Sequence, residues 1–212
     1  TKHPVITENL MGIKRAKGSY QKAKKPILIN DLKLIVNAID EDKNEKNKFK
    51  NRALILVGFA GGFRRSELVA ILYEDVDFVP EGVKIFVKRS KTDQSGEGMT
   101  KGIPYFSNPD YCPVISLKNW LEKSEIKSGK IFDMSDKSVA LTVKKYTALA
   151  GLDSNKYSGH SLRSGFATST AELGAEERSI MAMTGYKTTQ MVRRYIQEAN
   201  LFKNNALNKV KI

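Results

Sequence analysis

The stretch Ser158-Gly159-His160-Ser161-Leu162-Arg163 marks the start of a helix with two different faces. Leu162 and Phe166 stand four residues apart and can both pack inward. His160 and Arg163 stand three residues apart and share another face. An imidazole beside a guanidinium is suited to holding a phosphate and moving a proton. A structural His/Arg pair is the alternative that these residues alone leave open.

Helical periodicity extends to both sides of this stretch, which predicts a mainly helical chain. Trp120 lies on the apolar side of one expected helix and should belong to the core. Residues 1–27 are rich in lysine and are expected to form little helix. The expected helices cover residues 30–39 with Asn30 as N-cap, 49–60, 67–72 with Ser66 as N-cap, 113–123, 138–149, 160–173, 176–183 and 189–199, with a charged loop at 41–47.

The spacing of apolar residues changes from helical to alternating in the middle of the chain. Val83, Ile85 and Val87 alternate with other residues, which indicates a strand. The turn-forming run 92–98 and a second strand at 101–105 would complete an antiparallel hairpin, with a third strand at 75–78. The predicted fold class is therefore mainly α with a small antiparallel β-sheet (α+β).

The charge of the chain indicates a nucleic-acid partner. Its 212 residues include 36 Lys and Arg against 23 Asp and Glu, a formal net charge of +13. Such an excess usually marks binding to nucleic acid, with solvated lysine-rich faces as the alternative. One cysteine, Cys112, and two histidines exclude a disulfide framework and a zinc site built on cysteines or clustered histidines. The sequence contains no long apolar run of the kind that spans a membrane.

Further polar residues are suited to phosphate chemistry. Arg64 and Arg65 stand at an expected helix start, where backbone N–H groups already favour an anion. Lys91, at the beginning of the expected turn, could donate a proton to a leaving oxygen, and Tyr195 offers a phenol as nucleophile. Taken singly, each has an ordinary alternative: a surface arginine pair, a solvated turn lysine and a core tyrosine.

Five blocks of residues, taken in order, resemble the tyrosine recombinase/phage integrase family of DNA-breaking enzymes. The resemblance extends over about residues 27–200, nearly the whole chain. No single block is decisive, but five blocks in this order are highly specific. The blocks are Gly62-Phe63-Arg64-Arg65-Ser66-Glu67-Leu68, Ser90-Lys91-Thr92-Asp93, Gly159-His160-Ser161-Leu162-Arg163-Ser164-Gly165, Thr184-Gly185-Tyr186-Lys187 and Arg194-Tyr195.

The resemblance implies a role for each matching residue. Arg64 and Arg163 would hold the scissile phosphate, and Tyr195 would attack it. Lys91 would protonate the leaving oxygen, while His160 would assist proton transfer. Glu67 is implied as the acidic residue that orients the site, and the surrounding DNA-binding residues are expected to be Arg65, Lys88, Arg89, Lys187, Arg193 and Arg194.

One position departs from the family pattern. Nine residues before the nucleophile the family usually has histidine or tryptophan, and this chain has Tyr186. A phenol can donate one hydrogen bond to a phosphate oxygen, but it carries no positive charge. We expect Tyr186 to belong to the site, with weaker charge stabilisation there and an unchanged type of reaction.

The resemblance also implies how the chain is divided and what it does. Residues 1–27 are expected to be a basic linker with the remnant of a missing N-terminal core-binding domain, 28–200 the catalytic domain, and 201–212 a tail that docks on a neighbouring subunit or on its own domain. The implied function is site-specific recombination or integration of double-stranded DNA through a 3′-phosphotyrosyl intermediate at Tyr195, without ATP, metal or other cofactor. The active form is expected to be a homotetramer on two duplexes, the isolated domain a monomer, and the location the cytoplasm, at the nucleoid. A type IB topoisomerase-like enzyme and a non-catalytic DNA-binding module with the same fold are the alternatives.

Overall fold

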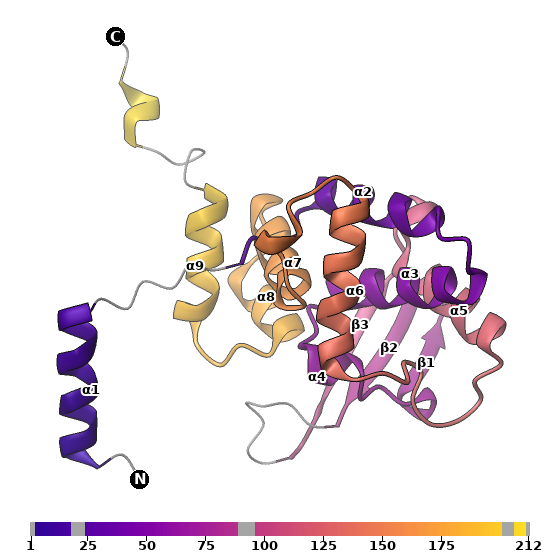
Figure 1. Ribbon diagram of the computed structural model, residues 1–212, viewed down its shortest axis with the longest axis horizontal. Helices are drawn as coiled ribbons and strands as arrows, with labels where there is room; N and C mark the ends of the chain where they lie inside the picture. Colours follow the sequence, from indigo (N-terminus) through magenta and orange to yellow (C-terminus); the bar gives the residue numbers. More distant parts are fainter. Residues whose placement is uncertain (1–2, 18–23, 89–95, 201–205, 211–212) are drawn as a thin grey trace.

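The fold consists mainly of helices, with a small antiparallel sheet packed at one side of them, as Figure 1 shows. The computed structural model describes residues 3–17, 24–88, 96–200 and 206–210. The fold class expected from the sequence, mainly α with a small antiparallel sheet, is confirmed.

Helix α3 (Glu45–Ala60) lies at the centre of the fold. Residues 53–60 are all buried, so this half of the helix has no solvent face. The helix begins within the segment that was expected to be a charged loop, because the side chain of Asn44 accepts a hydrogen bond from the Asn47 N–H at 2.9 Å and caps it. It packs against α2 (Ile29–Asp40), α5 (Pro113–Ser124) and α7 (His160–Glu172).

The sheet has the three strands expected from the sequence, in the order β1 (Val76–Val79), β2 (Gly82–Val87) and β3 (Met99–Pro104). Adjacent strands are antiparallel, with Val83 opposite Ile103 and Ile85 opposite Lys101. The inward row on β2 is apolar, as its alternation predicts. On β3 the inward row contains Lys101 together with Ile103, so one buried position is occupied by a charged residue.

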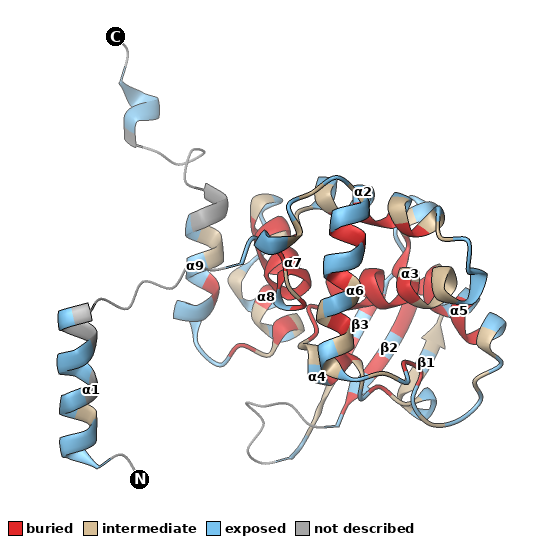
Figure 2. Ribbon diagram, in the orientation of Figure 1, coloured by how far each residue is buried: buried red, intermediate tan, exposed pale blue. Residues whose placement is uncertain are grey.

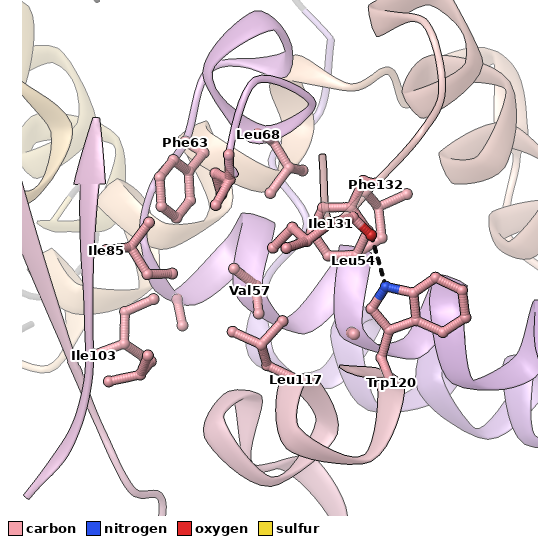
Figure 3. Close-up of a cluster of buried hydrophobic side chains, with 14 of the residues drawn as sticks. Leu54, Val57, Phe63, Leu68, Ile85, Ile103, Leu117, Trp120, Ile131 and Phe132 are labelled. Carbon is pink, nitrogen blue, oxygen red and sulfur yellow. Dashed lines mark hydrogen bonds between the residues drawn. The ribbon is translucent and has the colours of Figure 1, made fainter. Parts of the chain in front are cut away.

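The main core lies between the sheet and α3 and α5 (Figure 3). Figure 2 shows buried residues along α3 and α7, and the strands β2 and β3 contribute further buried residues. Trp120 is buried, as expected, and its indole N–H donates to the carbonyl of Ile131 at 2.8 Å. The labelled members of this core are Leu54, Val57, Phe63, Leu68, Ile85, Ile103, Leu117, Trp120, Ile131 and Phe132.

The C-terminal helices form a separate apolar cluster. Helices α8 (Glu177–Thr184) and α9 (Thr189–Asn200) pack against α7 and against each other. Their cluster contains Phe166, Ile180, Tyr186 and Val192, and is distinct from the two larger clusters around α3. The remaining elements are α6 (Asp136–Leu149), η1 (Tyr73–Asp75), η2 (Pro109–Tyr111), η3 (Ser154–Lys156) and η4 (Ala206–Lys209).

Three expectations about helices are wrong. Residues 1–27 are not helix-poor, because α1 runs from Pro4 to Lys17 with proline at its first position, where the missing N–H is tolerated. Helix α2 begins at Ile29, with Leu28 rather than Asn30 in the N-cap position. Helix α4 is only Arg65–Leu68, with Arg64 rather than Ser66 in the N-cap position, and Leu72 pairs with Lys130 in an isolated β-bridge instead of continuing the helix.

Candidate active site

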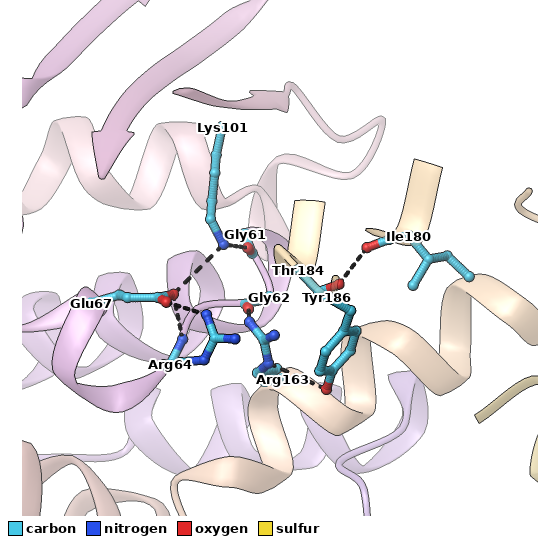
Figure 4. A network of polar contacts seen from close by, with 9 residues as sticks. All are labelled: Gly61, Gly62, Arg64, Glu67, Lys101, Arg163, Ile180, Thr184 and Tyr186. Atoms are coloured by element: carbon cyan, nitrogen blue, oxygen red, sulfur yellow. Dashed lines mark hydrogen bonds and ion pairs between the residues drawn. The ribbon is translucent and has the colours of Figure 1, made fainter. Parts of the chain in front are cut away.

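The guanidinium of Arg163 is a deeply buried charged group of the candidate site. Arg163 is 1% exposed on α7. Its Nη1 donates to the carbonyl of Gly62 at 2.7 Å, and its Nε donates to the hydroxyl of Tyr186 at 3.3 Å (Figure 4). Its Nη2 is buried without a hydrogen-bond partner among the described residues. A buried guanidinium with a spare N–H group favours an anionic ligand.

The electrostatic environment of Arg163 also favours an anion. Burial lowers the pKa of its guanidinium, and the positive charge of Arg64 lowers it further. The ring of Tyr186 lies against the guanidinium, with 4.3 Å between Cζ and the ring centroid. A negatively charged group placed between the two arginines would relieve their repulsion.

The turn at Gly61 and Gly62 brings the end of α3 to Arg163. Gly62 has a φ of +53°, a left-handed conformation that favours glycine. A Cβ at Gly62 would lie 3.0 Å from Cδ1 of Phe166, so a side chain there would also press on this ring. The glycine pair that precedes Phe63 and the two arginines therefore aims a backbone carbonyl at the guanidinium of Arg163.

Arg64 and Glu67 form an ion pair at the start of α4. Nη1 of Arg64 lies 2.5 Å from Oε1 of Glu67, and the Arg64 backbone N–H donates to Oε2 at 2.9 Å. Glu67 is 3% exposed, so the pair is largely shielded from water on the carboxylate side. Glu67 thus holds Arg64 through both the side chain and the backbone of the arginine.

Two phenols and an imidazole meet beside Arg163. The hydroxyl of Tyr186 donates to that of Tyr195 at 3.2 Å, and the Tyr195 hydroxyl lies 3.5 Å from Nε2 of His160. The rings of the two tyrosines stack with centroids 6.0 Å apart. A continuous chain of polar contacts therefore runs from His160 through Tyr195 and Tyr186 to Arg163.

The protein environment shifts the acidity of these groups. Burial raises the pKa of the Tyr195 phenol, and the hydrogen bond from Tyr186 adds to the rise, while Arg163 and Arg194 oppose it. Burial of the imidazole lowers the pKa of His160, and the positive charges of Arg163, Arg64 and Arg65 lower it further. At neutral pH the phenol is protonated and the imidazole is neutral, which is the pairing a base needs in order to accept the phenol proton.

Lys101 is a member of this cluster that the sequence reasoning missed. It is 1% exposed on β3, and its Nζ donates to the carbonyl of Gly61 at 2.8 Å. The same Nζ lies 3.9 Å from Oε2 of Glu67. Burial lowers its pKa to about 7, against the opposing effect of Glu67. The signal was present in the strand alternation, because Lys101 and Ile103 share one face of the expected strand.

The predicted DNA-binding residues lie around the cluster rather than in it. Arg65 faces Asp136 at 3.8 Å, Lys88 pairs with Asp75 at 2.9 Å, and Arg193 pairs with Glu177 at 3.0 Å. Lys187 and Arg194 are exposed. The predicted general acid Lys91 and the neighbouring Arg89 lie outside the described residues.

Metal-binding clusters and membrane spans are both lacking in the part of the chain that the structure describes. Within the described ranges, no group of three or more His, Cys, Asp and Glu side chains is placed to hold a metal ion. No helix among the described residues has the length and apolar character needed to cross a membrane.

The fold and this cluster place the chain in a known class. The model of the phage integrase family matches residues 27–201, which is most of the chain. The chain therefore belongs to the phage integrase family, and the resemblance seen in its sequence is confirmed.

Individual relatives support this assignment. An integrase/recombinase xerD homolog of Selenomonas ruminantium is 46% identical over 221 residues, which cover 99% of this chain and 64% of that protein. The tyrosine recombinase XerA of Pyrococcus furiosus is 29% identical over 75% of this chain and 58% of that protein. The chain thus spans between half and two thirds of the length of these curated relatives.

Solved structures share the fold. The XerH site-specific recombinase in a post-cleavage complex with palindromic difH substrate superposes with a TM-score of 0.67 at 20% identity, over 87% of this chain and 54% of that one. A lambda integrase dimer bound to a COC′ core site superposes with a TM-score of 0.61 at 19% identity, over 99% of this chain and 57% of that one. At these identities the likeness shows the fold alone.

Proposed function

We propose that this chain is the catalytic part of a site-specific DNA recombinase or integrase that forms a 3′-phosphotyrosyl intermediate at Tyr195. The observation that carries the proposal is the polar chain from His160 through Tyr195 and Tyr186 to the buried Arg163. The proposed nucleophile contacts the proposed base directly, and Tyr186 joins it to the proposed phosphate-binding guanidinium. Membership of the phage integrase family and the names of the relatives support the same reaction.

In the proposed reaction, the Tyr195 oxygen attacks the scissile phosphorus. The phosphorus–O5′ bond breaks, the 3′ end becomes linked to Tyr195, and Lys91 supplies the proton for the leaving 5′-oxygen. Arg163 and Arg64 neutralise the non-bridging oxygens, where charge accumulates in the transition state. A 5′-hydroxyl from a partner strand then attacks the phosphotyrosine, which rejoins DNA and frees the phenol. The bond energy is kept in the covalent intermediate, so no ATP is consumed.

His160 is proposed to take the proton of the Tyr195 phenol. Its lowered pKa keeps the imidazole neutral at neutral pH. In the tautomer that is protonated on Nδ1, Nε2 can accept the proton of the phenol, whose oxygen lies 3.5 Å away. The hydroxyl of Tyr186 donates to the same oxygen and accepts from Arg163, so it can stabilise negative charge as the phenol loses its proton.

A trapping experiment tests the proposal and does not require a defined target sequence. Nicked duplexes with a randomised core release a short strand after cleavage, which leaves the protein attached to DNA. We expect denaturation-resistant adducts with the unchanged protein, none with Tyr195→Phe, and adducts with Tyr186→Phe as the matched phenol control. Adducts that depend on Tyr186 instead would contradict the assignment of the nucleophile.

The same assay separates the proposal from its rivals. DNA binding without any adduct would favour a non-catalytic module. Relaxation of supercoiled plasmid without a paired site, together with adducts on many unrelated sequences, would favour a type IB topoisomerase-like enzyme. Recovery of one enriched core sequence is the outcome that supports a site-specific recombinase.

We further propose that the active form is a homotetramer on two DNA duplexes, acting at the nucleoid in the cytoplasm, with 28–200 as the catalytic domain. Residues 1–27 are proposed as linker and remnant of a core-binding domain, and 201–212 as a tail that docks on a neighbouring subunit. Leu207 and Val210 in the tail are 71% and 53% exposed, which leaves apolar surface for such a contact. Deleting 201–212 is expected to leave monomer binding intact and to remove higher assemblies on DNA in light-scattering measurements.

A further inference from the structure

Lys101 contacts Gly61 and Glu67, which lie next to the two candidate phosphate-binding arginines. It is not part of the chain of polar contacts that runs from His160 to Arg163. We propose that Lys101 is a positioning residue that sets Arg64 and Arg163 for phosphate binding. This inference rests on the proposed function, because it assumes that the two arginines bind the scissile phosphate. Its geometry is shown in Figure 4, where Lys101 points from the sheet toward Gly61 and Glu67.

The first connection runs through the glycine turn to Arg163. Nζ of Lys101 donates to the carbonyl of Gly61 at 2.8 Å, and the carbonyl of the next residue, Gly62, accepts from Nη1 of Arg163 at 2.7 Å. Adjacent carbonyls of one turn are thus bound by two different cations. Gly61 and Gly62 have no side chains that could fix the turn, and Gly62 has a φ of +53°. Hydrogen bonds to the two carbonyls therefore have a larger part in holding the orientation of the turn.

The second connection runs through Glu67 to Arg64. Oε2 of Glu67 accepts from the backbone N–H of Arg64 and lies 3.9 Å from Nζ of Lys101. Oε1 of the same carboxylate binds Nη1 of Arg64 at 2.5 Å. Lys101 therefore attracts the carboxylate at Oε2 while the guanidinium binds Oε1, and the charge of Lys101 helps to fix where Arg64 is held.

The surroundings of Lys101 argue against a role at the surface or in direct DNA contact. The residue is 1% exposed, and Nζ lies 4.4 Å from the centroid of the Phe63 ring in the main core. A lysine buried at this depth is unfavourable unless its charge is paired and its N–H groups are bonded. The strand pattern predicts an apolar residue at this position. The presence of a lysine there is explained if the orientation of the two arginines depends on it.

Variants of Lys101 test the proposal on a duplex recovered in the trapping experiment. Lys101→Met keeps the length of the side chain and removes its charge and donors, and Lys101→Gln keeps a donor without the charge. Lys84→Met is the matched control, because Lys84 is exposed on the adjacent strand β2. We expect the Met variant to form adduct at least tenfold more slowly than the unchanged protein, the Gln variant to lie between, and the control to be unaffected.

Two modified substrates distinguish positioning of the arginines from general damage and from acid catalysis. A methylphosphonate at the scissile position carries no negative charge and needs the arginines less, so the rate difference between the unchanged protein and Lys101→Met should shrink to less than threefold. In a 5′-bridging phosphorothiolate substrate, sulfur replaces the leaving oxygen and departs as a thiolate that needs no proton. This substrate should therefore not restore the rate of adduct formation of Lys101→Met if Lys91 is the acid.

The outcomes separate this inference from the proposed function. If the unchanged protein forms no adduct, the proposed function fails first. If it does and folded Lys101→Met or Lys101→Gln keeps its rate within twofold, the positioning role is refuted. Rescue of Lys101→Met by the thiolate would refute it too, by making Lys101 the acid. Should thermal melting show that neither variant folds, Lys101→Arg, which keeps charge and donors, must retain adduct formation for the proposal to survive.

Discussion

Replacing Tyr186 by phenylalanine removes a single hydroxyl that joins the buried Arg163 to Tyr195, the proposed nucleophile. The ring would remain stacked on Tyr195 and against the guanidinium of Arg163, with centroid separations of 6.0 Å and 4.3 Å as in the unchanged protein. The hydrogen bonds to Arg163 Nε and to the Tyr195 hydroxyl would be lost. The substitution therefore tests the hydroxyl and leaves the packing in place.

The expected size of the effect follows from those two contacts. A hydrogen bond to a charged group contributes about 1.5–3 kcal/mol, and such a bond to the developing phenolate exists only as the proton leaves. Losing it should slow adduct formation about 10- to 150-fold. Stability should fall by about 1–3 kcal/mol, because the Nε–H of Arg163 would lose its partner in a buried position.

Single-turnover kinetics on the trapped substrate measure this effect directly. The fraction of protein linked to DNA is followed on denaturing gels after rapid quenching, with thermal melting as the check on folding. Tyr186→His is the complementary variant, because an imidazole at this position can donate a hydrogen bond and can carry positive charge. We expect its rate of adduct formation to equal or exceed that of the unchanged protein. A Phe variant within twofold of the unchanged rate would refute the part assigned to the Tyr186 hydroxyl.

Three other predictions concern stability and binding. A Cβ on Gly165 would lie 2.0 Å from the carbonyl oxygen of Ile27, so Gly165→Ala should destabilise the fold by at least about 2 kcal/mol in denaturant titrations, whereas Gly102→Ala, with open space at Cβ, should change it little. The pKa of Lys101 is about 7 in the fold against 10.5 for a free lysine, so the unfolded chain binds more protons between those values. Unfolding free energy of the unchanged protein should therefore rise relative to Lys101→Met across that window, by up to about 1.4 kcal/mol per pH unit, and a parallel pair of curves would contradict the assignment. If the six predicted DNA-binding residues each neutralise one phosphate, affinity measured by fluorescence anisotropy should fall about a thousandfold from 50 to 200 mM salt, and a flat isotherm would exclude this.

The fold was predictable where periodicity and burial agree. The alternation of Val83, Ile85 and Val87 identified β2 correctly, and the apolar run 53–60 identified α3. Helix starts were less accurate, because Asn44 rather than a later residue caps α3, and α2 begins without any side-chain cap. Helix α1 was missed because its apolar residues face solvent, with Ile6 and Ile13 more than half exposed, so its pattern resembled a linker.

The candidate site was predictable only through the order of its motifs. Local pattern puts His160 and Arg163 on one helix, but the contact of Arg163 with Gly62 joins residues 101 positions apart. Helical or strand periodicity relates only residues that are close in sequence, so it could not predict this contact. Only the resemblance to a family connected the two segments. Lys101 was not identified as a site residue because lysines in strands usually face water. Its burial depends on the pairing of β2 with β3.

The separate packing of the C-terminal helices has a consequence for how such a protein can diversify. Tyr195 is carried by α9, whose anchor Val192 belongs to the small cluster with Ile180 and Phe166, whereas Leu68, beside Arg64, belongs to the main core. Substitutions in the small cluster can therefore shift the Tyr195 hydroxyl, the proposed nucleophile, while the packing beneath Arg64 stays as it is. Sequence variation at the C-terminal end of the molecule can thus alter the proposed reaction geometry with little change to the main core.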